Sequence, residues 1–377
     1  MNSTASTNPT KTILIMAGGT GGHIFPGIAV AEYLTLHDWQ VHWLGTPDHM
    51  EAQIVPKHGI PLHFVEVSGL RGKGIGQKIK SVWRLFTAIF KAMRIIRKVK
   101  PDAVLGMGGY ASGAGGIAAK ICRVPLLVHE QNAVLGLTNR WLAKIANRVM
   151  LGFGSAARQL GNASHVVVTG NPIRASIGQL AKQTDVTAQL PLKILIVGGS
   201  LGARPFNQAL PAILARFSNC EIVHQTGKGN GQAVEEAYRH AGRTADLTVT
   251  EFLDNIGECY QWADLVICRA GAITVTEVSL AGIAAIFIPL PHAVDDHQTA
   301  NAQSLVSRRA GYLIKQANMQ DELPQLLKDI IDHPSQLEEI RLNALDCAIS
   351  DAAKQVATQC ELAIENKKRF SSRGAVL

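Results

Sequence analysis

A short apolar run followed by a glycine-rich turn occurs twice in this chain, and this repeat most constrains the fold. The first copy, TILIMAGGTGGH, begins at Thr12, and the second, KILIVGGSLGAR, begins at Lys193. A buried apolar run that ends in glycines predicts a parallel strand whose turn leads into the N-terminus of a helix. Such a helix end carries free N–H groups and a partial positive charge, so it favours phosphate. The repeat therefore predicts two similar halves, each able to bind an anion.

Each half continues with apolar runs that alternate with amphipathic stretches, as expected for a parallel sheet with helices on both faces. The first half contains QVHWLG, LHFVEV, AVLGMGG, PLLVHE and RVMLGF, and the second contains EIVHQTG, LTVTEFL, DLVICRAG and AAIFIPL. A helix is expected to begin near Pro26, and a final helix, over about 335–366, has no strand after it. The length of 377 residues also favours two domains. The sequence thus predicts an α/β protein with two Rossmann-like, doubly wound domains that join near Arg174.

Composition excludes several classes of protein. Hydrophobic residues make up 47% of the chain and charged residues 18%, which is typical of a globular protein. The polar N-terminal segment lacks the apolar core of a signal peptide, and no apolar stretch reaches the roughly 20 residues needed to cross a bilayer. The six cysteines form no CxxC pair, so neither a metal site nor a disulfide framework is indicated. We therefore expect a cytoplasmic protein with reduced thiols.

The net charge of +8 is concentrated in residues 71–100, which contain ten Lys or Arg and no Asp or Glu. On a helix, the basic and the apolar side chains of this segment fall on opposite sides. A core-packed helix with a solvated basic face is the usual outcome, but the lack of acidic residues and the excess of apolar ones favour docking on an anionic membrane. Nucleic acid is not expected, because no recognition-helix or aromatic-interleaved pattern accompanies the charge. The expected membrane-contacting residues are Ile75, Lys80, Trp83, Arg84, Phe86, Phe90, Lys91 and Arg94.

Neither glycine-rich turn matches a dinucleotide-binding fingerprint. Ile24 stands where GxGxxG requires its third glycine in the first turn, and Ser200 where it requires the second glycine in the other. No acidic residue ends QVHWLG to hold an adenosine ribose, and no P-loop GK[ST] is present, so a nicotinamide-dependent oxidoreductase is a disfavoured alternative. Each turn alone is explained equally well as a tight turn. A third such sequence, GMGGYASGAGG at 106–116, makes phosphate binding the better interpretation.

Polar residues follow several predicted strands, at the edge of the sheet where ligands bind in doubly wound folds. Any one of them could be a capping or turn residue, as Glu277 would be in the first turn of a helix. The presence of so many polar residues at one edge of the sheet favours a binding site. They are His23, Tyr110, His129, Glu130, Gln131, Asn132, Arg174, Arg269, Glu277 and residues 295–298.

Nearly the whole chain resembles the MurG-type UDP-N-acetylglucosamine:undecaprenyl-pyrophosphoryl-muramoylpentapeptide N-acetylglucosaminyltransferases of bacterial wall synthesis. The resemblance is carried by GGTGGHIFPG, SGLRGKG, GMGGYASGAGG, HEQNAVLGLTNRWLAKIA, GNPIR, VGGSLGAR, TEFLDNI, CRAGAITVTE and DHQTANA, in this order. It implies the glycosyltransferase B architecture, in which two Rossmann-like domains face a central cleft. It also implies an acceptor domain over residues 1–173 plus 352–377, to which the C-terminal helix returns, and a donor domain over 174–351.

The same resemblance implies the reaction and its partners. N-acetylglucosamine would pass from UDP-GlcNAc to the 4-hydroxyl of the muramoyl sugar of lipid I, with inversion at C1, to give lipid II. No cofactor is implied, and the chain has no DxD motif that would indicate a metal-bridged diphosphate. The expected location is the cytoplasmic side of the bacterial inner membrane, with other wall-synthesis proteins as candidate partners. The alternatives are a transferase of this fold with another lipid acceptor and a non-catalytic sensor of the nucleotide sugar.

Site residues are carried over from the family by position. His23 and Glu130 are the candidates for the base that takes the proton of the acceptor hydroxyl, and His23 is favoured because imidazole titrates near neutrality. The acceptor is expected to contact Gly19, His23, Gly108, Gly109, Tyr110 and His129. The donor is expected to contact Thr20, Gly21, Gly22, Asn132, Arg174, Ser200, Leu253, Arg269, Ala272, Ile273, Thr274, Val275, Thr276, Glu277 and Gln298. Among these, Ser200 would meet the diphosphate, Glu277 the ribose hydroxyls and Gln298 the sugar hydroxyls, whereas the role of His297 is left open.

Overall fold

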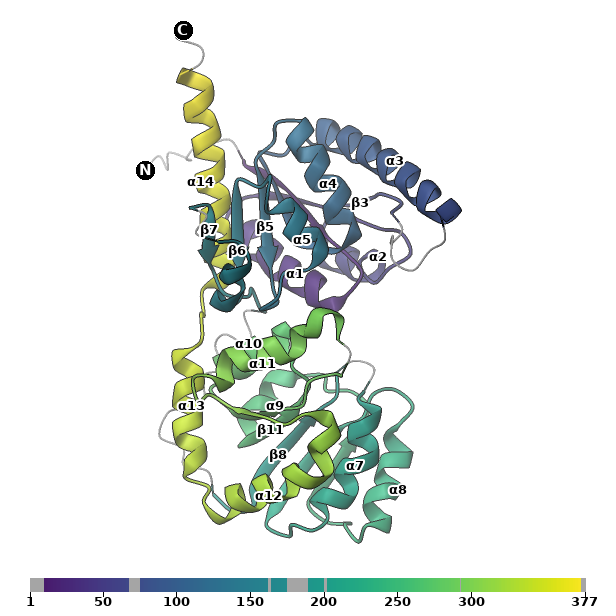
Figure 1. Cartoon of the computed structure of the whole chain (residues 1–377), viewed down its shortest axis with the longest axis vertical. Coiled ribbons are helices and arrows are strands. Elements are labelled where there is room, and N and C mark those ends of the chain that lie inside the picture. Colours follow the sequence, from purple (N-terminus) through teal and green to yellow (C-terminus); the bar gives the residue numbers. More distant parts are fainter. Residues whose placement is uncertain are drawn as a thin grey trace, which may run out of the picture. The chain divides into compact units, whose positions relative to one another are not determined.

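The computed structural model describes residues 10–67, 75–161, 164–174, 189–199, 202–291 and 293–373 of the chain. The chain divides into two compact units (Figure 1). The first consists of residues 1–131, 135–172 and 351–377, and the second consists of residues 132–134 and 173–350. Each unit contains one fully parallel sheet, so the expected α/β fold class with two doubly wound domains is confirmed.

The first unit is built on a seven-stranded sheet with the strand order β3-β2-β1-β4-β5-β6-β7. Side chains of its central strand alternate between two apolar cores. Ile13 and Ile15 pack with helices α1 and α14 on one face, and Leu14 and Met16 pack with α3 and α4 on the other. Because the strand is buried on both faces, its sequence is a continuous apolar run. The strands are β1 (Thr12–Ala17), β2 (Gln40–Gly45), β3 (Leu62–Phe64), β4 (Ala103–Gly108), β5 (Leu126–Glu130), β6 (Arg148–Leu151) and β7 (Val166–Val168).

Helices cover both faces of this sheet, and the last of them, α14, comes from the C-terminal end of the chain (Figure 1). The helices of the first unit are α1 (Gly21–Thr35), α2 (Glu51–Ile54), α3 (Ile75–Val99), α4 (Gly109–Ile121), α5 (Leu137–Leu142) and α14 (Ala352–Arg373), with 3-10 turns η1 (Val55–His58) and η2 (Gly154–Gln159).

The second unit is built on a six-stranded sheet with the order β10-β9-β8-β11-β12-β13. Its strands are β8 (Leu192–Val197), β9 (Cys220–Gln225), β10 (Leu247–Thr250), β11 (Leu265–Cys268), β12 (Ala284–Phe287) and β13 (Tyr312–Leu313). Its helices are α7 (Arg204–Leu214), α8 (Gly231–His240), α9 (Ile256–Trp262), α10 (Ala272–Ala281), α11 (His297–Val306), α12 (Met319–Asp332) and α13 (Gln336–Asp346), with 3-10 turns η3 (Val294–Asp296) and η4 (Gln316–Asn318).

Both sheets reverse their strand order at the same relative place, between β1 and β4 in the first and between β8 and β11 in the second. Ligands of doubly wound folds bind beyond the carboxyl ends of the strands at this reversal. The two glycine-rich turns follow β1 and β8, so each lies at the reversal point of its own sheet. The two copies of the repeated sequence are therefore the central strands of two sheets with the same topology.

Helix α1 begins earlier than the sequence pattern predicts. It starts at Gly21, and Pro26, which was expected near its start, lies inside it. Proline removes one backbone hydrogen bond, to the carbonyl of residue i−4, which here belongs to Gly22 in the first turn. The helix tolerates this loss because it falls in the first turn. Gly21 and Gly22 therefore form the first turn of a helix rather than a loop.

The single final helix predicted over 335–366 is wrong, because the chain forms two helices that break at residues 347–351. Leu337 and Ile340 of α13 join the core of the second unit. Val356 and Cys360 of α14 join the core of the first. Helical periodicity is continuous across both segments and does not reveal that their apolar faces serve different cores. Helix α14 therefore packs in the first unit, the unit to which the family resemblance implies that the C-terminal helix returns.

Gly27 allows α1 to pack directly on Trp43 of β2. A Cβ at Gly27 would lie 2.6 Å from Cη2 of Trp43, whose ring is fully buried and donates from Nε1 to the carbonyl oxygen of Ala17 at 3.0 Å. We expect Gly27→Ala to lower the free energy of unfolding by about 1–3 kcal/mol, as measured by chemical denaturation. The control is Gly113→Ala in α4, where the new Cβ would meet Thr138 Cγ2 at an ordinary 3.5 Å. Equal stability of the two variants would contradict this packing.

Candidate active site

His23 lies in the first turn of α1, and its ring packs against the end of β4. The ring is half-buried, and its Nδ1 lies 3.3 Å from the carbonyl oxygen of Gly18 and 3.4 Å from Oγ1 of Thr20. Gly108 has a φ of +111°, and a Cβ there would lie 2.8 Å from the imidazole of His23. Only glycine fits both the conformation and the space. The structure therefore brings together His23 and Gly108, which are 85 residues apart in the sequence, at the reversal point of the first sheet.

Other predicted acceptor residues surround this histidine. Gly109 has a φ of +83°, and a Cβ there would collide with the carbonyl oxygen of Gly18. Tyr110, in the first turn of α4, has an exposed side chain. Gly19 is also exposed, as is the predicted donor residue Thr20. The turns after β1 and β4 thus form one surface on which a ligand could lie next to the His23 ring.

His129 and Glu130 end the neighbouring strand, β5, but both are buried. The carboxylate of Glu130 accepts hydrogen bonds from the N–H of Gly136 at 3.0 Å and from Nδ2 of Asn139 at 2.9 Å. Nε2 of His129 lies 2.9 Å from the carbonyl oxygen of Gly170. Burial lowers the pKa of His129 to about 4, so its ring is neutral at pH 7 and donates this bond. Both side chains therefore hold neighbouring loops in place.

Residues 132–134 belong to the second unit, although they directly follow β5 in the sequence. Asn301 of α11, which is fully buried, holds them there. Its Oδ1 accepts from the N–H of Ala133 at 2.8 Å, and its Nδ2 donates to Asn132 Oδ1 at 3.2 Å and to the carbonyl oxygen of Ala270 at 3.1 Å. Asn301 lies in the DHQTANA motif but had no predicted role. It fixes the predicted donor residue Asn132 close to the end of β11.

The second glycine-rich turn is held by an amide from the end of β9. Gln225 accepts from the N–H of Gly198 at 3.1 Å and donates from Nε2 to the carbonyl oxygen of Gly199 at 3.0 Å. Gly199 has a φ of +88°, and the space where a Cβ would stand is open. Ser200, the predicted diphosphate contact, lies outside the described residues. Helix α7 begins four residues beyond Ser200, at Arg204.

Glu277 of α10 has a strongly shifted pKa. Burial raises the pKa of its carboxyl from 4.5 to about 7, although the hydroxyl of Tyr260 and the charge of Arg174 both act to lower it. The Tyr260 hydroxyl donates to Oε2 of Glu277 at 3.3 Å. A carboxyl group that changes charge near neutral pH is common at functional sites. Two predicted donor residues, Arg174 and Glu277, are thus close in space, and Tyr260 is a partner that the sequence did not indicate.

Arg269, which follows β11, is held firmly at the edge of the second sheet. Its guanidinium donates to the carbonyl oxygens of Ile288 at 3.0 Å and Pro289 at 3.2 Å, and it stacks 4.5 Å above the ring of Phe206. Burial lowers its pKa below the ordinary value of an arginine side chain. The side chain is therefore a fixed positive charge next to the predicted donor residues.

The remaining donor predictions fall on different parts of the second unit. In α10, Val275 is fully buried, and the hydroxyl of Thr276 donates to the carbonyl oxygen of Ala272 at 2.9 Å. Ile273 and Thr274 are half-buried in the first turn of the same helix. Gln298 accepts from the N–H of Leu290 at 2.9 Å. Leu253 is half-buried after β10.

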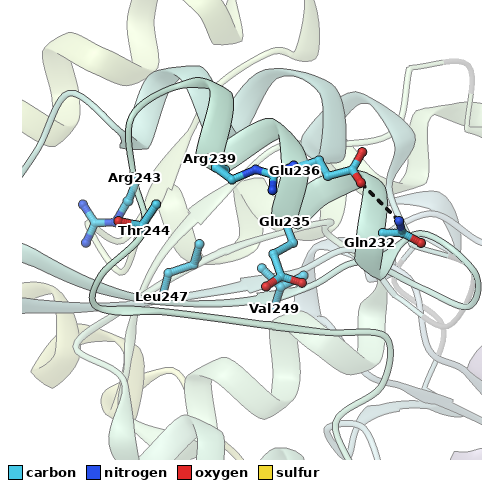
Figure 2. Close-up of a pocket in the computed structure, with 8 residues that line it drawn as sticks. All are labelled: Gln232, Glu235, Glu236, Arg239, Arg243, Thr244, Leu247 and Val249. Carbon is cyan, nitrogen blue, oxygen red and sulfur yellow. Dashed lines mark hydrogen bonds between the residues drawn. The ribbon is translucent and has the colours of Figure 1, made fainter.

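A pocket of about 360 Å³ lies between α8 and β10, at the outer edge of the second sheet (Figure 2). Two of its side chains are joined by a hydrogen bond of 3.1 Å from Nε2 of Gln232 to Oε1 of Glu236. It is lined by Gln232, Glu235, Glu236, Arg239, Arg243, Thr244, Leu247 and Val249, none of which is a predicted site residue. Within the described parts of the chain, no three or more His, Cys, Asp or Glu side chains gather as they would around a metal ion.

Helix α3 exposes a row of aromatic side chains. Trp83, Phe86 and Phe90 are 70%, 55% and 64% exposed, whereas Ala88 and Ala92 face the core. The predicted membrane residues Arg84, Lys91 and Arg94 are also exposed, and the side chains of Ile75 and Lys80 lie outside the described part of the helix. Of the helices in the described ranges, none is both long and apolar enough to cross a membrane.

Two doubly wound parallel sheets, each with a glycine-rich turn at its reversal point, form the glycosyltransferase B architecture. Residues 13–151 match the glycosyltransferase family 28 N-terminal domain, and residues 193–356 match the family 28 C-terminal domain. UDP-GlcNAc 2-epimerase from Neisseria meningitidis, bound to UDP-GlcNAc, shares the fold at a TM-score of 0.65, but only 14% of its residues are identical.

Relatives with much higher sequence identity show which family within glycosyltransferase family 28 the chain belongs to. The UDP-N-acetylglucosamine–N-acetylmuramyl-(pentapeptide) pyrophosphoryl-undecaprenol N-acetylglucosamine transferase of Tolumonas auensis is 51% identical, over 94% of this chain and 99% of the relative. The enzyme of the same name from Pseudoalteromonas translucida is 49% identical, over 95% of this chain and 99% of the relative. The crystal structure of Acinetobacter baumannii MurG has a TM-score of 0.80 at 38% identity, and the match covers 93% of this chain and 99% of that one. The chain belongs to the MurG family of N-acetylglucosaminyltransferases within glycosyltransferase family 28.

The pKa of Glu277 predicts how stability depends on pH. In the folded protein the pKa is about 7, above the ordinary 4.5, so the neutral carboxyl favours folding. That contribution is complete below the ordinary pKa and is lost as the pH rises through the folded pKa. The melting temperature of Glu277→Gln minus that of the wild type should therefore be larger at about pH 8 than at about pH 5. The control, Glu258→Gln at an exposed site, should show no such change, and a pH-independent difference for Glu277→Gln would contradict the buried carboxyl.

Proposed function

We propose that the chain transfers N-acetylglucosamine from UDP-GlcNAc to the 4-hydroxyl of the muramoyl sugar of lipid I (undecaprenyl-pyrophosphoryl-muramoylpentapeptide), which forms lipid II. The observation that carries the proposal is 51% identity, over 94% of the chain, to a relative whose name states this donor and acceptor. The glycine-rich turn at the reversal point of the second sheet supports it, because the diphosphate of a nucleotide-sugar donor needs such a site.

Donor binding is assigned to residues 174–351, and acceptor binding to residues 1–173 plus 352–377. The donor assignment is supported by the neutral amide of Gln225 beneath the second turn, which adds no negative charge where a diphosphate would lie. In this arrangement Ser200 contacts the diphosphate, Glu277 accepts hydrogen bonds from the ribose hydroxyls, and Gln298 contacts the hydroxyls of the sugar. Arg269 supplies a nearby positive charge.

The reaction is a single in-line displacement at C1 of the donor sugar. His23 accepts the proton of the 4-hydroxyl while that oxygen forms its bond to C1. The bond between C1 and the diphosphate oxygen breaks, and UDP leaves with the electron pair. The N-terminus of α7 and the hydroxyl of Ser200 stabilise the charge that develops on the departing diphosphate.

The environments of the two candidate bases support His23 over Glu130. The ring of His23 is half-buried, at a turn whose neighbours Gly19 and Thr20 are exposed. The carboxylate of Glu130 is 1% exposed and accepts hydrogen bonds from Gly136 and Asn139. A base must come within hydrogen-bond reach of the hydroxyl that it deprotonates, which favours the accessible group.

Substitution of His23 tests this assignment. We expect His23→Ala to lower kcat by about 10²–10⁴-fold without raising the KM for UDP-GlcNAc, measured as UDP release with a soluble lipid I analogue. His37→Ala, beyond the far end of α1, is the control and should keep the wild-type rate. Wild-type activity in His23→Ala would refute the base assignment.

The same assay separates the alternatives for the acceptor. A wild-type enzyme that releases UDP with a different lipid-linked sugar, and not with the lipid I analogue, would support the alternative acceptor. Binding of UDP-GlcNAc without UDP release with any acceptor would support the sensor.

We also propose that α3 docks the enzyme on the anionic cytoplasmic face of the inner membrane, where a lipid-linked acceptor is held. The support is the exposure of Trp83, Phe86 and Phe90 beside exposed basic residues on the same helix. The core-facing side of the helix is formed by Ala88, Ala92, Met93 and Ile96, so the exposed aromatic side chains lie outside that core. Aromatic and basic side chains on one exposed helix are typical of interfacial membrane binding.

Removal of charge from α3 should weaken this docking. Lys91 pairs with Glu66 at 3.5 Å, so Arg84 and Arg94 are the better targets. At about 1 kcal/mol per basic residue, Arg84→Gln/Arg94→Gln should bind vesicles of phosphatidylglycerol and phosphatidylcholine about 30-fold more weakly at low salt, in a sedimentation assay. Arg308→Gln/Arg309→Gln removes the same charge from exposed sites in the second unit and should bind normally. Equal losses for the two variants would contradict a local docking site.

A further inference from the structure

A buried carboxylate supports the first glycine-rich turn from within the protein. Glu51 opens α2, and its side chain is fully buried. Its Oε2 accepts from the N–H of Gly19 at 3.1 Å, and its Oε1 accepts from the N–H of Thr46 at 2.9 Å and from the Thr46 hydroxyl at 2.7 Å. A buried carboxylate is costly unless it is hydrogen-bonded, and these three bonds meet that requirement.

Two glycines leave space for this carboxylate. A Cβ at Gly18 would collide with Oε1 of Glu51, and a Cβ at Gly45 would lie 2.7 Å from its Cγ. Gly18 was part of the sequence that predicted phosphate binding. Its lack of a side chain is explained by the internal carboxylate, with no need for a ligand at that position.

The turn held by Glu51 is the turn that carries His23. Gly19, whose N–H is bound to Glu51, has a φ of +91°. The residues on either side of it, Gly18 and Thr20, both place an oxygen within 3.4 Å of Nδ1 of His23. Any shift of the turn at Gly19 therefore moves the groups that orient the imidazole.

The equivalent turn of the second unit is held in a different way. Gln225 ends β9, which lies beside β8 as β2 lies beside β1. It supports Gly198 and Gly199 with a neutral amide, whereas Glu51 supports Gly19 with a negative charge. A carboxylate beneath a turn repels a second anion placed on that turn, and a neutral amide does not. The second turn is therefore suited to a diphosphate, whereas in the first turn the N–H of Gly19 is already bound to a carboxylate of the protein itself.

We propose that Glu51 is a positioning residue for His23. Through Gly19 it holds the first glycine-rich turn in the conformation that presents the imidazole to the acceptor hydroxyl, and it takes the N–H that a phosphate would otherwise bind. This inference rests on the proposed transferase function and on His23 as its base.

Glu51→Gln tests the proposal with little change of shape. Its amide nitrogen must face an N–H donor, either at Gly19 or at Thr46, so one of the supporting bonds is lost. We expect kcat with the lipid I analogue to fall by about 10–100-fold, because small misplacements of reacting groups carry costs of this size. The KM for UDP-GlcNAc should not change, because the donor is assigned to the second unit. Glu32→Gln on α1 is the control and should keep the wild-type kcat.

A double variant shows whether Glu51 acts through His23. If it does, Glu51→Gln/His23→Ala should be no slower than His23→Ala alone. Losses that multiply would overturn the proposal, as would a wild-type kcat in Glu51→Gln. If Glu51→Gln melts below the assay temperature, Thr46→Val replaces it, since it removes only the hydroxyl donor. That variant should be several-fold slower than the wild type and also non-additive with His23→Ala, and an unchanged rate would overturn the proposal.

A measurement without turnover separates this inference from the proposed function. The imidazole NMR resonances of His23 should shift in Glu51→Gln and not in Glu32→Gln. Unshifted resonances would overturn the positioning role even in an active enzyme. If the wild type released no UDP with the lipid I analogue, the proposed function would fail, while shifted resonances would still establish that Glu51 orients His23.

Discussion

Burial of the first strand of each unit on both faces is the constraint on which the rest of the structure depends. β1 supplies Ile13 and Ile15 to one core and Leu14 and Met16 to the other, so it must run through the middle of its sheet. A strand in the middle of a doubly wound sheet ends where the strand order reverses. The turn after it then meets the turn after the fourth strand. The contact between His23 and Gly108 is a direct consequence of this topology.

The two turns share a backbone design but differ in the charge of the group that supports them. Glu51 places a carboxylate beneath one turn, and Gln225 places an amide beneath the other. This difference supports the proposed division of chemistry, in which the first unit presents a basic side chain and the second accommodates a diphosphate. The raised pKa of Glu277 and the fixed guanidinium of Arg269 place further charge-sensitive groups in the second unit.

Helix α3 separates two kinds of apolar residue. Ala88, Ala92, Met93 and Ile96 lie in the core of the first unit, whereas Trp83 and Phe90 face outward. The aromatic side chains therefore contribute little to folding, and their hydrophobic area is available for a membrane surface. The same helix also carries the exposed basic residues, so in the proposed docking apolar insertion and electrostatic attraction would act at one place.

The sequence by itself determined the two-unit α/β fold, most of the strands and the place of both turns, because apolar runs and glycines act through local rules of burial and backbone conformation. It did not reveal that Glu51 binds Gly19, that Tyr260 binds Glu277, or that one apparent helix divides between two cores. Those contacts join residues that lie far apart in the chain or in different elements. Only the tertiary structure decided them, because hydrogen-bond partners and packing depend on which strands and helices become neighbours.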